Sequence, residues 1–383
     1  MSAKSLIHRF ILSLILCVGV GLMTSCANRG SGPQGGPVDS IPPRIVASVP
    51  EDGTTNFTGQ EIQLRFNEYV RLDKPTEQVL ISPPQQAQPI IKAVGKKVSV
   101  TFSDTLLPNT TYTIYFGDAI QDNNEKNALS GHTLSFSTGA QIDSLTLSGD
   151  VIFAETLLPA VGAIVGIHDA TAEDSVIYKK PFVHITRTDS LGHFTISHVA
   201  SGQYRVYALS DSNRTYTYEV GEPVAFADSV IVVPDSGLHL RLFNEPKPMD
   251  TLHIKTDTLS VPTDTIDSVT IKQVAKDSTG TATLRVRVEP AIAMAYIQLL
   301  TDKEVVVATL PVIESVLFDR LKGGSYKVRM YIDLNSDSVW TTGNLLLRRQ
   351  PEPMYYYPKR LRIRDNWDYE ETFRWQDESV RPQ

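Results

Sequence analysis

The stretch EIQLRFN, Glu61 to Asn67, alternates apolar and polar side chains. Ile62, Leu64 and Phe66 fall on one face of an extended segment, because successive side chains of a β-strand point to opposite sides. The same period of two recurs, with turn residues between the segments, in KKVSVTF (96–102), TTYTIYF (110–116) and HTLSFST (132–138). This pattern predicts antiparallel strands that each cover one side of a shared core.

The rest of the chain continues in the same style. Its 383 residues include 23 Pro and 23 Gly, which separate short runs rich in Val, Ile, Thr and Tyr. No window carries a long helical period, so we expect an all-β fold of tandem antiparallel β-sandwiches joined by polar linkers. The net charge of −7 leaves no basic surface for a nucleic acid, and we expect no nucleic-acid partner.

The first predicted unit covers residues 41–139. The stretches that characterise it are PPRIVASVPEDGTTNF, LRFNEYV, LPNTTYTIYFGDAIQDNNEKN and LSFSTG. In these stretches the unit resembles the bacterial Ig-like domain of the SbsA type. The resemblance implies a structural spacer or interaction module without catalytic activity.

The second predicted unit covers residues 144–242. It contains the strand-like runs LSGDVIF, AIVGIHDA, GHFTISHV and SGQYRVYALSD, and in these it resembles the transthyretin-like sandwich found beside carboxypeptidases. The resemblance concerns the fold alone. We expect Gly192 and Gly202 at hairpin turns that need a positive φ angle.

The second unit recurs further along the chain. After a linker rich in Asp, Thr and Pro at 243–279, GSYKVRMYIDLN (324–335) aligns without a gap with GQYRVYALSDSN (202–213), and a later Glu-Pro pair matches at Glu222 and Glu352. We therefore expect a second, divergent copy of the sandwich at 280–376, followed by a polar tail at 377–383. Residues common to two copies with unequal loops are expected to serve the fold.

The N-terminus has the layout of a secretory signal. Lys4 and Arg9 precede an apolar run from Phe10 to Met23, which is shorter than the ~20 residues that a membrane-spanning helix needs. The run exits through LMTSC, which resembles a bacterial lipobox, with cleavage between Ser25 and Cys26. An ordinary signal peptide or an uncleaved anchor remains an alternative.

The lipobox resemblance assigns residues 1–25 to a lipoprotein signal peptide and Cys26 to lipidation, including palmitate. Cys17, the other cysteine, would leave with the signal, and removing Lys4 and Arg9 moves the net charge from −7 to −9. Two acyl chains anchor a protein stably to a membrane. The Gly/Pro-rich segment 26–40 then serves as a tether.

As a whole the chain resembles the Ig-like-domain lipoproteins of the Bacteroidetes envelope. No acidic residue follows Cys26 directly, so we expect the periplasmic face of the outer membrane rather than the cell surface. The resemblance implies a non-catalytic scaffold or protein-interaction module, with a membrane and an envelope protein as partners. The alternatives are a glycan-binding lipoprotein and an accessory subunit of an envelope enzyme or secretion complex.

One loop carries the ligand spacing of a calcium site. Asp333, Asn335 and Asp337 stand at positions one, three and five, although Ser338 and Asn344 occupy the positions where an EF-hand needs Gly and Glu. The alternative is an Asx-capped turn. No zinc, nucleophile-elbow, P-loop or dinucleotide pattern is present, so we expect no enzyme, no catalytic residues and no cofactor.

Aromatic residues gather in the last unit, which holds all three tryptophans and the run Tyr355 to Tyr357. Flat aromatic rings stack on sugars, yet most aromatics in small sandwiches lie in the core. Since one face of a Tyr-Tyr-Tyr strand points outward, Trp340 and Tyr356 are candidate glycan-stacking residues, with Tyr355 and Tyr357 as the alternative pair.

A tripeptide of Asp, Ser or Thr, and then Ala, Ile, Leu, Val, Met or Thr occurs 12 times, against roughly two expected from abundance. It resembles the acceptor motif for periplasmic O-glycosylation in Bacteroidetes, although Asp-Ser and Asp-Thr are also ordinary turn pairs. Four copies cluster in the linker. They make candidate acceptors of Thr251, Thr258, Thr265 and Ser268.

Overall fold

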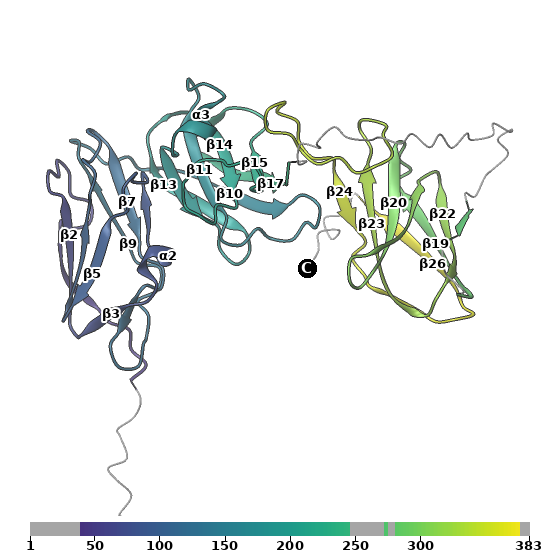
Figure 1. Ribbon diagram of the computed structural model, residues 1–383, viewed down its shortest axis with the longest axis horizontal. Helices are drawn as coiled ribbons and strands as arrows, with labels where there is room; N and C mark the ends of the chain where they lie inside the picture. Colours follow the sequence, from purple (N-terminus) through teal and green to yellow (C-terminus); the bar gives the residue numbers. More distant parts are fainter. Residues whose placement is uncertain (1–38, 246–271, 275–279, 376–383) are drawn as a thin grey trace, which may run out of the picture.

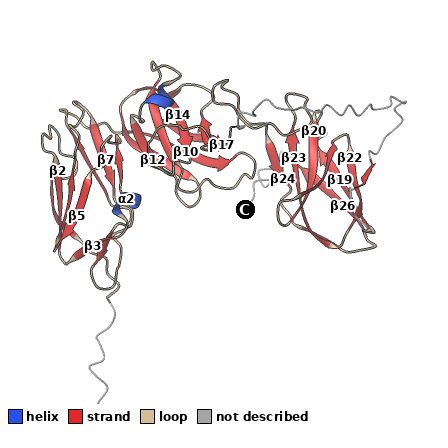
Figure 2. Ribbon diagram, viewed as in Figure 1, coloured by secondary structure: helices blue, strands red, loops and turns tan. Residues whose placement is uncertain are grey.

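The computed structural model describes residues 39–245, 272–274 and 280–375. They form three β-sandwiches in a row along the long axis of the molecule (Figure 1). Helix within this part of the chain is limited to two single turns, α2 (Pro75–Gln78) and α3 (Val176–Lys179), as Figure 2 shows. The prediction of tandem β-sandwiches is confirmed.

The first sandwich has one sheet of four antiparallel strands and one of three. The four-stranded sheet has the order β1 (Ile45–Val49), β2 (Glu61–Phe66), β6 (Lys97–Thr101), β5 (Ile90–Val94). The three-stranded sheet has the order β4 (Leu80–Ser82), β7 (Thr111–Tyr115), β9 (Thr133–Ser137). A ribbon pairs β3 (Val70–Leu72) with β8 (Ile120–Asp122). The predicted alternation in β2 is confirmed, since Ile62, Leu64 and Phe66 are at most 2% exposed.

The second sandwich packs a three-stranded sheet against a larger one. The smaller sheet has the order β13 (His193–Val199), β10 (Leu145–Phe153), β17 (Asp235–Leu242). The larger has the order β12 (His184–Arg187), β11 (Ile164–Asp169), β14 (Gly202–Leu209), β15 (Val224–Phe226), and β16 (Ile231–Val233) also pairs with β14. The first and last strands, β10 and β17, pair in parallel.

The third sandwich repeats this topology. Its smaller sheet has the order β18 (Lys272–Val274), β22 (Ser315–Leu321), β19 (Ala282–Glu289), β26 (Asp368–Arg374), so it has one edge strand more than its counterpart. Its larger sheet has the order β21 (Val306–Pro311), β20 (Ala295–Thr301), β23 (Gly324–Ile332), β24 (Met354–Tyr356), and β25 (Leu361–Ile363) also pairs with β23. β19 and β26, the counterparts of β10 and β17, are again parallel neighbours.

The predicted repeat holds at the level of strand register. Gly202 lies opposite Val233 and Tyr207 opposite Phe226 in the second sandwich. In the third, the matching Gly324 lies opposite Ile363, and Arg329 opposite Tyr356. The two aligned sequence stretches therefore form equivalent strands, β14 and β23. β14 pairs with β15 and β16, and β23 pairs with their counterparts β24 and β25.

One residue common to both copies, a tyrosine, serves the fold in each. The hydroxyl of Tyr204 donates to the carbonyl of Ala200 at 3.1 Å, and that of Tyr326 to the carbonyl of Lys322 at 2.9 Å. In both cases a tyrosine ties its strand to the backbone four residues upstream, which is the logic of a tyrosine corner.

One glycine expectation is confirmed and one is wrong. Gly192 has a φ of +80°, as a tight turn requires. Gly202 has no positive φ and is the first residue of β14. Its small size matters for another reason, because a Cβ atom there would lie 3.2 Å from the ring of Tyr204.

The expected linker is shorter at both ends than 243–279. Phe243 is 3% exposed and belongs to the core of the second sandwich. Lys272–Val274 form strand β18, which pairs in parallel with β22 at the edge of the third sandwich. Composition alone did not indicate this strand, because a three-residue strand has no periodicity to detect.

Candidate interdomain binding site

The loop that follows β14 has a shape imposed by Asp211. One carboxylate oxygen of Asp211 accepts the backbone N–H of Arg214 at 2.6 Å, and the other accepts that of Tyr216 at 2.8 Å. Arg214 and Tyr216 have φ angles of +62° and +55°. This left-handed conformation is unfavourable for residues with a Cβ atom. The two hydrogen bonds to Asp211 hold the loop in it.

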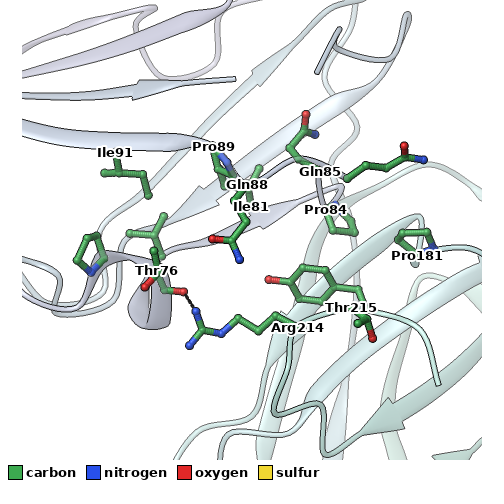
Figure 3. A pocket seen from close by; sticks show the side chains of 14 residues that line it. Thr76, Ile81, Pro84, Gln85, Gln88, Pro89, Ile91, Pro181, Arg214 and Thr215 are labelled. Carbon is green, nitrogen blue, oxygen red and sulfur yellow. Dashed lines mark hydrogen bonds between the residues drawn. The ribbon is translucent and has the colours of Figure 1, made fainter. Parts of the chain in front are cut away.

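Two arginines of the second domain bind the backbone of the first. Arg214 donates from Nη1 to the carbonyl of Thr76 (Figure 3), and Arg187 donates from Nη1 to the carbonyl of Glu77 at 2.7 Å. Both acceptors belong to α2, whose last carbonyls lack partners within the helix. Neither guanidinium forms an ion pair with another described residue. Burial lowers the pKa of Arg187.

A pocket of about 410 Å³ lies between the same two domains. Figure 3 shows Arg214 and Thr215 of the second domain on one side, and Thr76, Ile81 and Gln88 of the first domain on the other. The volume lies in the range of about 300–1,000 Å³ that is usual for small-molecule sites, which are frequent at domain interfaces.

The lining of this pocket is mixed in polarity and contains one charged side chain. Val79 and Ile81 give it an apolar floor. The segment between β4 and β5 adds the amides of Gln85, Gln86 and Gln88. Arg214 is the charged residue, and none of the described residues that line the pocket is Asp or Glu. Burial raises the pKa of the Tyr216 phenol, so it stays neutral at neutral pH.

Two histidines make further contacts between these domains. Ser82 Oγ lies 3.3 Å from His184 Nδ1 and accepts the backbone N–H of Ile185 at 3.0 Å. Thr113 Oγ1 lies 3.1 Å from His198 Nδ1. The pKa of His184 is lowered to about 4, chiefly by burial; the charge of Asp143 opposes this shift and that of His198 contributes to it. His184 is therefore a neutral ring at neutral pH.

The equivalent loop of the third domain contacts the second domain. It follows β23 and has the same backbone, since Ser336 and Ser338 occupy the positions of Arg214 and Tyr216 and have φ angles of +62° and +65°. Both copies have an Asp and a Glu in this loop, and the stretch between them is eight residues longer in the third domain (Asp333 to Glu352) than in the second (Asp211 to Glu222). The longer part supplies Thr342, which donates to the carbonyl of Asn244 at 2.7 Å, and Leu345, whose backbone N–H donates to Glu245 Oε1 at 2.7 Å.

A buried arginine completes this second junction. Arg329, 8% exposed, donates to Glu155 Oε1 and to the hydroxyl of Tyr356, each at 3.2 Å. Tyr356 in turn donates to the carbonyl of Glu155 at 3.2 Å. The side chain of Leu345 packs in the same apolar cluster as Phe243. The same loop of the repeat thus contacts the preceding domain at both junctions.

The comparison with family models identifies the first domain. Residues 39–138 match the bacterial Ig-like domain. This range agrees with the predicted 41–139, and the fold of two antiparallel sheets agrees with the name. No curated protein matches the chain.

Solved structures give weak likenesses. The N-terminal part of the bacterial S-layer protein SbsC is 17% identical over 50% of this chain and 41% of that one, with a TM-score of 0.19. BcpA, the major pilin subunit of Bacillus cereus, is 12% identical over 51% and 67%, with a TM-score of 0.18. An L,D-transpeptidase from Mycobacterium smegmatis is 12% identical over 43% and 76%, with a TM-score of 0.19. The chain spans less than half of the S-layer protein, and scores this low carry no conclusion about activity or partners.

The residues of the predicted calcium site lie beyond the Ig-like domain, in the loop after β23. Asp333 accepts the backbone N–H groups of Asp337 at 3.2 Å and Ser338 at 2.9 Å, and Asn335 donates to Asp337 at 2.9 Å. Within the described residues, no three His, Cys, Asp or Glu side chains form a group that could hold a metal ion. The loop has the bonds of an Asx-capped turn, and calcium binding stays a prediction without a geometric argument in its favour.

The predicted stacking residues are not free to stack on a sugar. Tyr356 points away from the core of its own sandwich, as predicted, but it is 8% exposed because Arg329 and Glu155 cover it at the second junction, so its prediction as an exposed stacking ring is wrong. Trp340 packs partly buried at the same junction and donates from Nε1 to the carbonyl of Glu352 at 3.0 Å. The tryptophan that is exposed is Trp367, at 56%.

Several predicted positions lie outside the described residues. These are the cleavage and lipidation residues Ser25 and Cys26 and the candidate acceptors Thr251, Thr258, Thr265 and Ser268. None of the helices in the described part of the chain is long and apolar enough to cross a membrane.

Sequence reasoning missed the pocket between the Ig-like domain and the second domain. Its strongest signal was PPQQAQP (83–89), in which amides and prolines replace the apolar alternation of the neighbouring strands. A second signal lay in the repeat. Arg214 and Tyr216 align with Ser336 and Ser338 in the other copy, so these two large side chains are not shared by the two copies. Neither signal reveals that the two segments meet, because that depends on how the domains dock.

Proposed function

We propose that this chain is a lipid-anchored, non-catalytic protein of the cell envelope that acts as a stiff spacer or scaffold for a protein partner. The observation that carries the proposal is the construction of its two junctions. Each combines packed side chains with hydrogen bonds from the same loop of the repeat, at Arg214 in one and Thr342 in the other. Domains joined in this way hold a fixed spacing, which suits a scaffold better than freely hinged modules do.

The bacterial Ig-like domain at residues 39–138 supports the modular role. We further propose that the second and third domains are two copies of a transthyretin-like sandwich. The common strand order and the pair Tyr204 and Tyr326 support this assignment.

The lipid anchor rests on Cys26 in the lipobox-like stretch LMTSC. The test is metabolic labelling with an alkyne-tagged palmitate, with the chain produced in a bacterium that processes lipoproteins. The wild-type chain should carry the label and fractionate with membranes, whereas Cys26→Ser should lose both properties. Cys17→Ser is the matched control and should leave them unchanged. Label retained in Cys26→Ser would refute the anchor.

The scaffold role predicts a protein partner. In-cell crosslinking followed by mass spectrometry should recover a reproducible envelope protein crosslinked to lysines of the folded domains. A partner that is itself an enzyme or a secretion component would favour the accessory-subunit alternative. Protease shaving of intact cells should leave the chain intact if it lies on the periplasmic face of the outer membrane.

A further inference from the structure

We propose that the pocket between the Ig-like domain and the second domain binds a short acidic saccharide. The site goes beyond the scaffold role, and it is separate from the aromatic residues of the third domain. Its walls come from two domains, so a bound ligand would also hold the first junction together.

The hydrogen-bonding groups of the pocket suit a sugar. A saccharide presents many hydroxyl groups that both donate and accept, and a carboxamide offers a donor and an acceptor side by side. Gln85, Gln86 and Gln88 line one wall of the pocket. The Oε1 atom of Gln85 is buried and has no hydrogen-bond partner among the described residues, while Nε2 of the same amide donates to the carbonyl of Pro83 at 3.4 Å.

The apolar groups suit the C–H face of a sugar ring. Val79, Ile81 and the half-buried Ile91 form a continuous apolar floor on the Ig-like side. Tyr216 contributes an aromatic ring from the opposite domain, and such rings pair an apolar body with a polar tip. A ligand that was apolar throughout would leave the amides unsatisfied.

The charge of the pocket selects an acidic sugar over a neutral one. Arg214 lines the pocket; its guanidinium forms no ion pair with a carboxylate among the described residues and uses Nη1 for the carbonyl of Thr76. Its remaining N–H groups are donors in a fixed planar fork that matches a carboxylate. With no Asp or Glu in the lining, a ligand carboxylate meets no like charge there.

The test uses the full-length lipidated protein in detergent micelles and two probes of equal length. These are the trimer of α-1,4-linked galacturonic acid and the neutral trimer of galactose, and binding is measured by isothermal titration calorimetry. The wild-type protein should bind the acidic trimer at least about tenfold more tightly than the neutral one, as expected for a hydrogen bond to a charged group. Saturation with the acidic trimer should raise the midpoint of thermal unfolding.

Three variants separate charge from packing. Arg214→Gln should weaken binding of the acidic trimer by at least about tenfold, because it removes the charge. It should leave the affinity for the neutral trimer within about threefold of the wild-type value, because it keeps an amide. Arg214→Lys should retain the preference for the acidic trimer. Gln88→Ala should weaken both trimers, since it removes a wall of the pocket. Arg360→Gln, an exposed site in the third domain, is the charge-matched control and should bind as the wild type does.

The proposal is overturned if the wild-type protein binds neither trimer at millimolar concentration, or binds the neutral one more tightly. Equal losses in Arg214→Gln and Arg360→Gln would overturn it as well, because they would reflect net charge alone. Failure here leaves the lipid anchor and the partner untouched, since those are tested by labelling and crosslinking.

Discussion

The junction between the Ig-like domain and the second domain should weaken as the pH falls. His184 is 7% exposed, and burial holds its pKa at about 4 against an ordinary 6.5. Between these two values the unfolded chain binds a proton that the folded chain does not, so the free energy of unfolding falls with decreasing pH. The loss of stability begins as the pH falls below 6.5, the ordinary pKa of histidine, and is complete below pH 4.

The magnitude follows from the two pKa values. One pKa unit corresponds to about 1.4 kcal/mol, so His184 costs about 2 kcal/mol of stability at pH 5 and about 3 kcal/mol below pH 4. His168, buried in the second domain with a pKa of about 4, adds a similar loss. The variant His184→Asn removes one of the two, because an amide near the Nδ1 position still reaches Ser82 and does not titrate.

The assay is hydrogen exchange read by mass spectrometry on peptides that cover 184–199. Tryptophan fluorescence is unsuitable, because all three tryptophans lie in the third domain. From pH 7.5 to pH 5, and after correction for the intrinsic exchange rate, His184→Asn should lose about 2 kcal/mol less protection than the wild type. His193→Asn, at an exposed position of β13, is the control and should behave as the wild type does. If His184→Asn and the wild type lost equal protection from hydrogen exchange between pH 7.5 and pH 5, the reasoning would be refuted.

Three substitutions test the packing and the second junction. Arg329→Leu removes the ion pair to Glu155 and should lower the free energy of unfolding of the third domain by about 2 kcal/mol, measured by tryptophan fluorescence in urea. Gly149→Ala would place a Cβ atom 1.9 Å from the carbonyl oxygen of Leu238, and it should cost more than about 3 kcal/mol or prevent folding of the second domain, measured by circular dichroism. Tyr326→Phe removes the hydrogen bond to Lys322 and should cost about 1 kcal/mol in the same urea assay.

Each of these substitutions has a matched control. Arg360→Leu removes an exposed arginine of the third domain and should stay within about 0.5 kcal/mol of the wild type. Ser148→Ala changes the position next to Gly149 without a backbone clash. Tyr355→Phe removes a hydroxyl in the same domain as Tyr326. If a control loses as much stability as its partner variant, the assigned contact is not the cause.

Much of the fold could be predicted because it follows from local pattern. Ile62, Leu64 and Phe66 are buried as their period of two requires, and the alignment of Gly202 with Gly324 marks two strands with the same register. A short-range rule suffices where a strand buries one face of a sheet. The parallel pairing of first and last strands did not follow, since it depends on contacts almost a hundred residues apart.

The candidate site was less accessible to sequence reasoning. Tyr356 looked like an outward-facing ring because alternation does not reveal that a second domain covers the outer face. The pocket at Arg214 and Gln88 joins segments that are over a hundred residues apart, and its existence depends on how two rigid sandwiches dock. The spacing at Asp333 suggested a metal, whereas backbone N–H groups satisfy its oxygens.

The parallel pairing of terminal strands has a mechanical consequence. In the second domain the chain enters through β10 and leaves through β17, which lie side by side with Phe153 opposite Leu242. A force that stretches the chain pulls these strands in opposite directions along their length, so the hydrogen bonds between them must shear together rather than open one at a time. The third domain has the same arrangement, from Thr283 opposite Asp368 to Glu289 opposite Arg374. We therefore expect a tether made of these two domains to resist extension at high force and to yield one whole domain at a time.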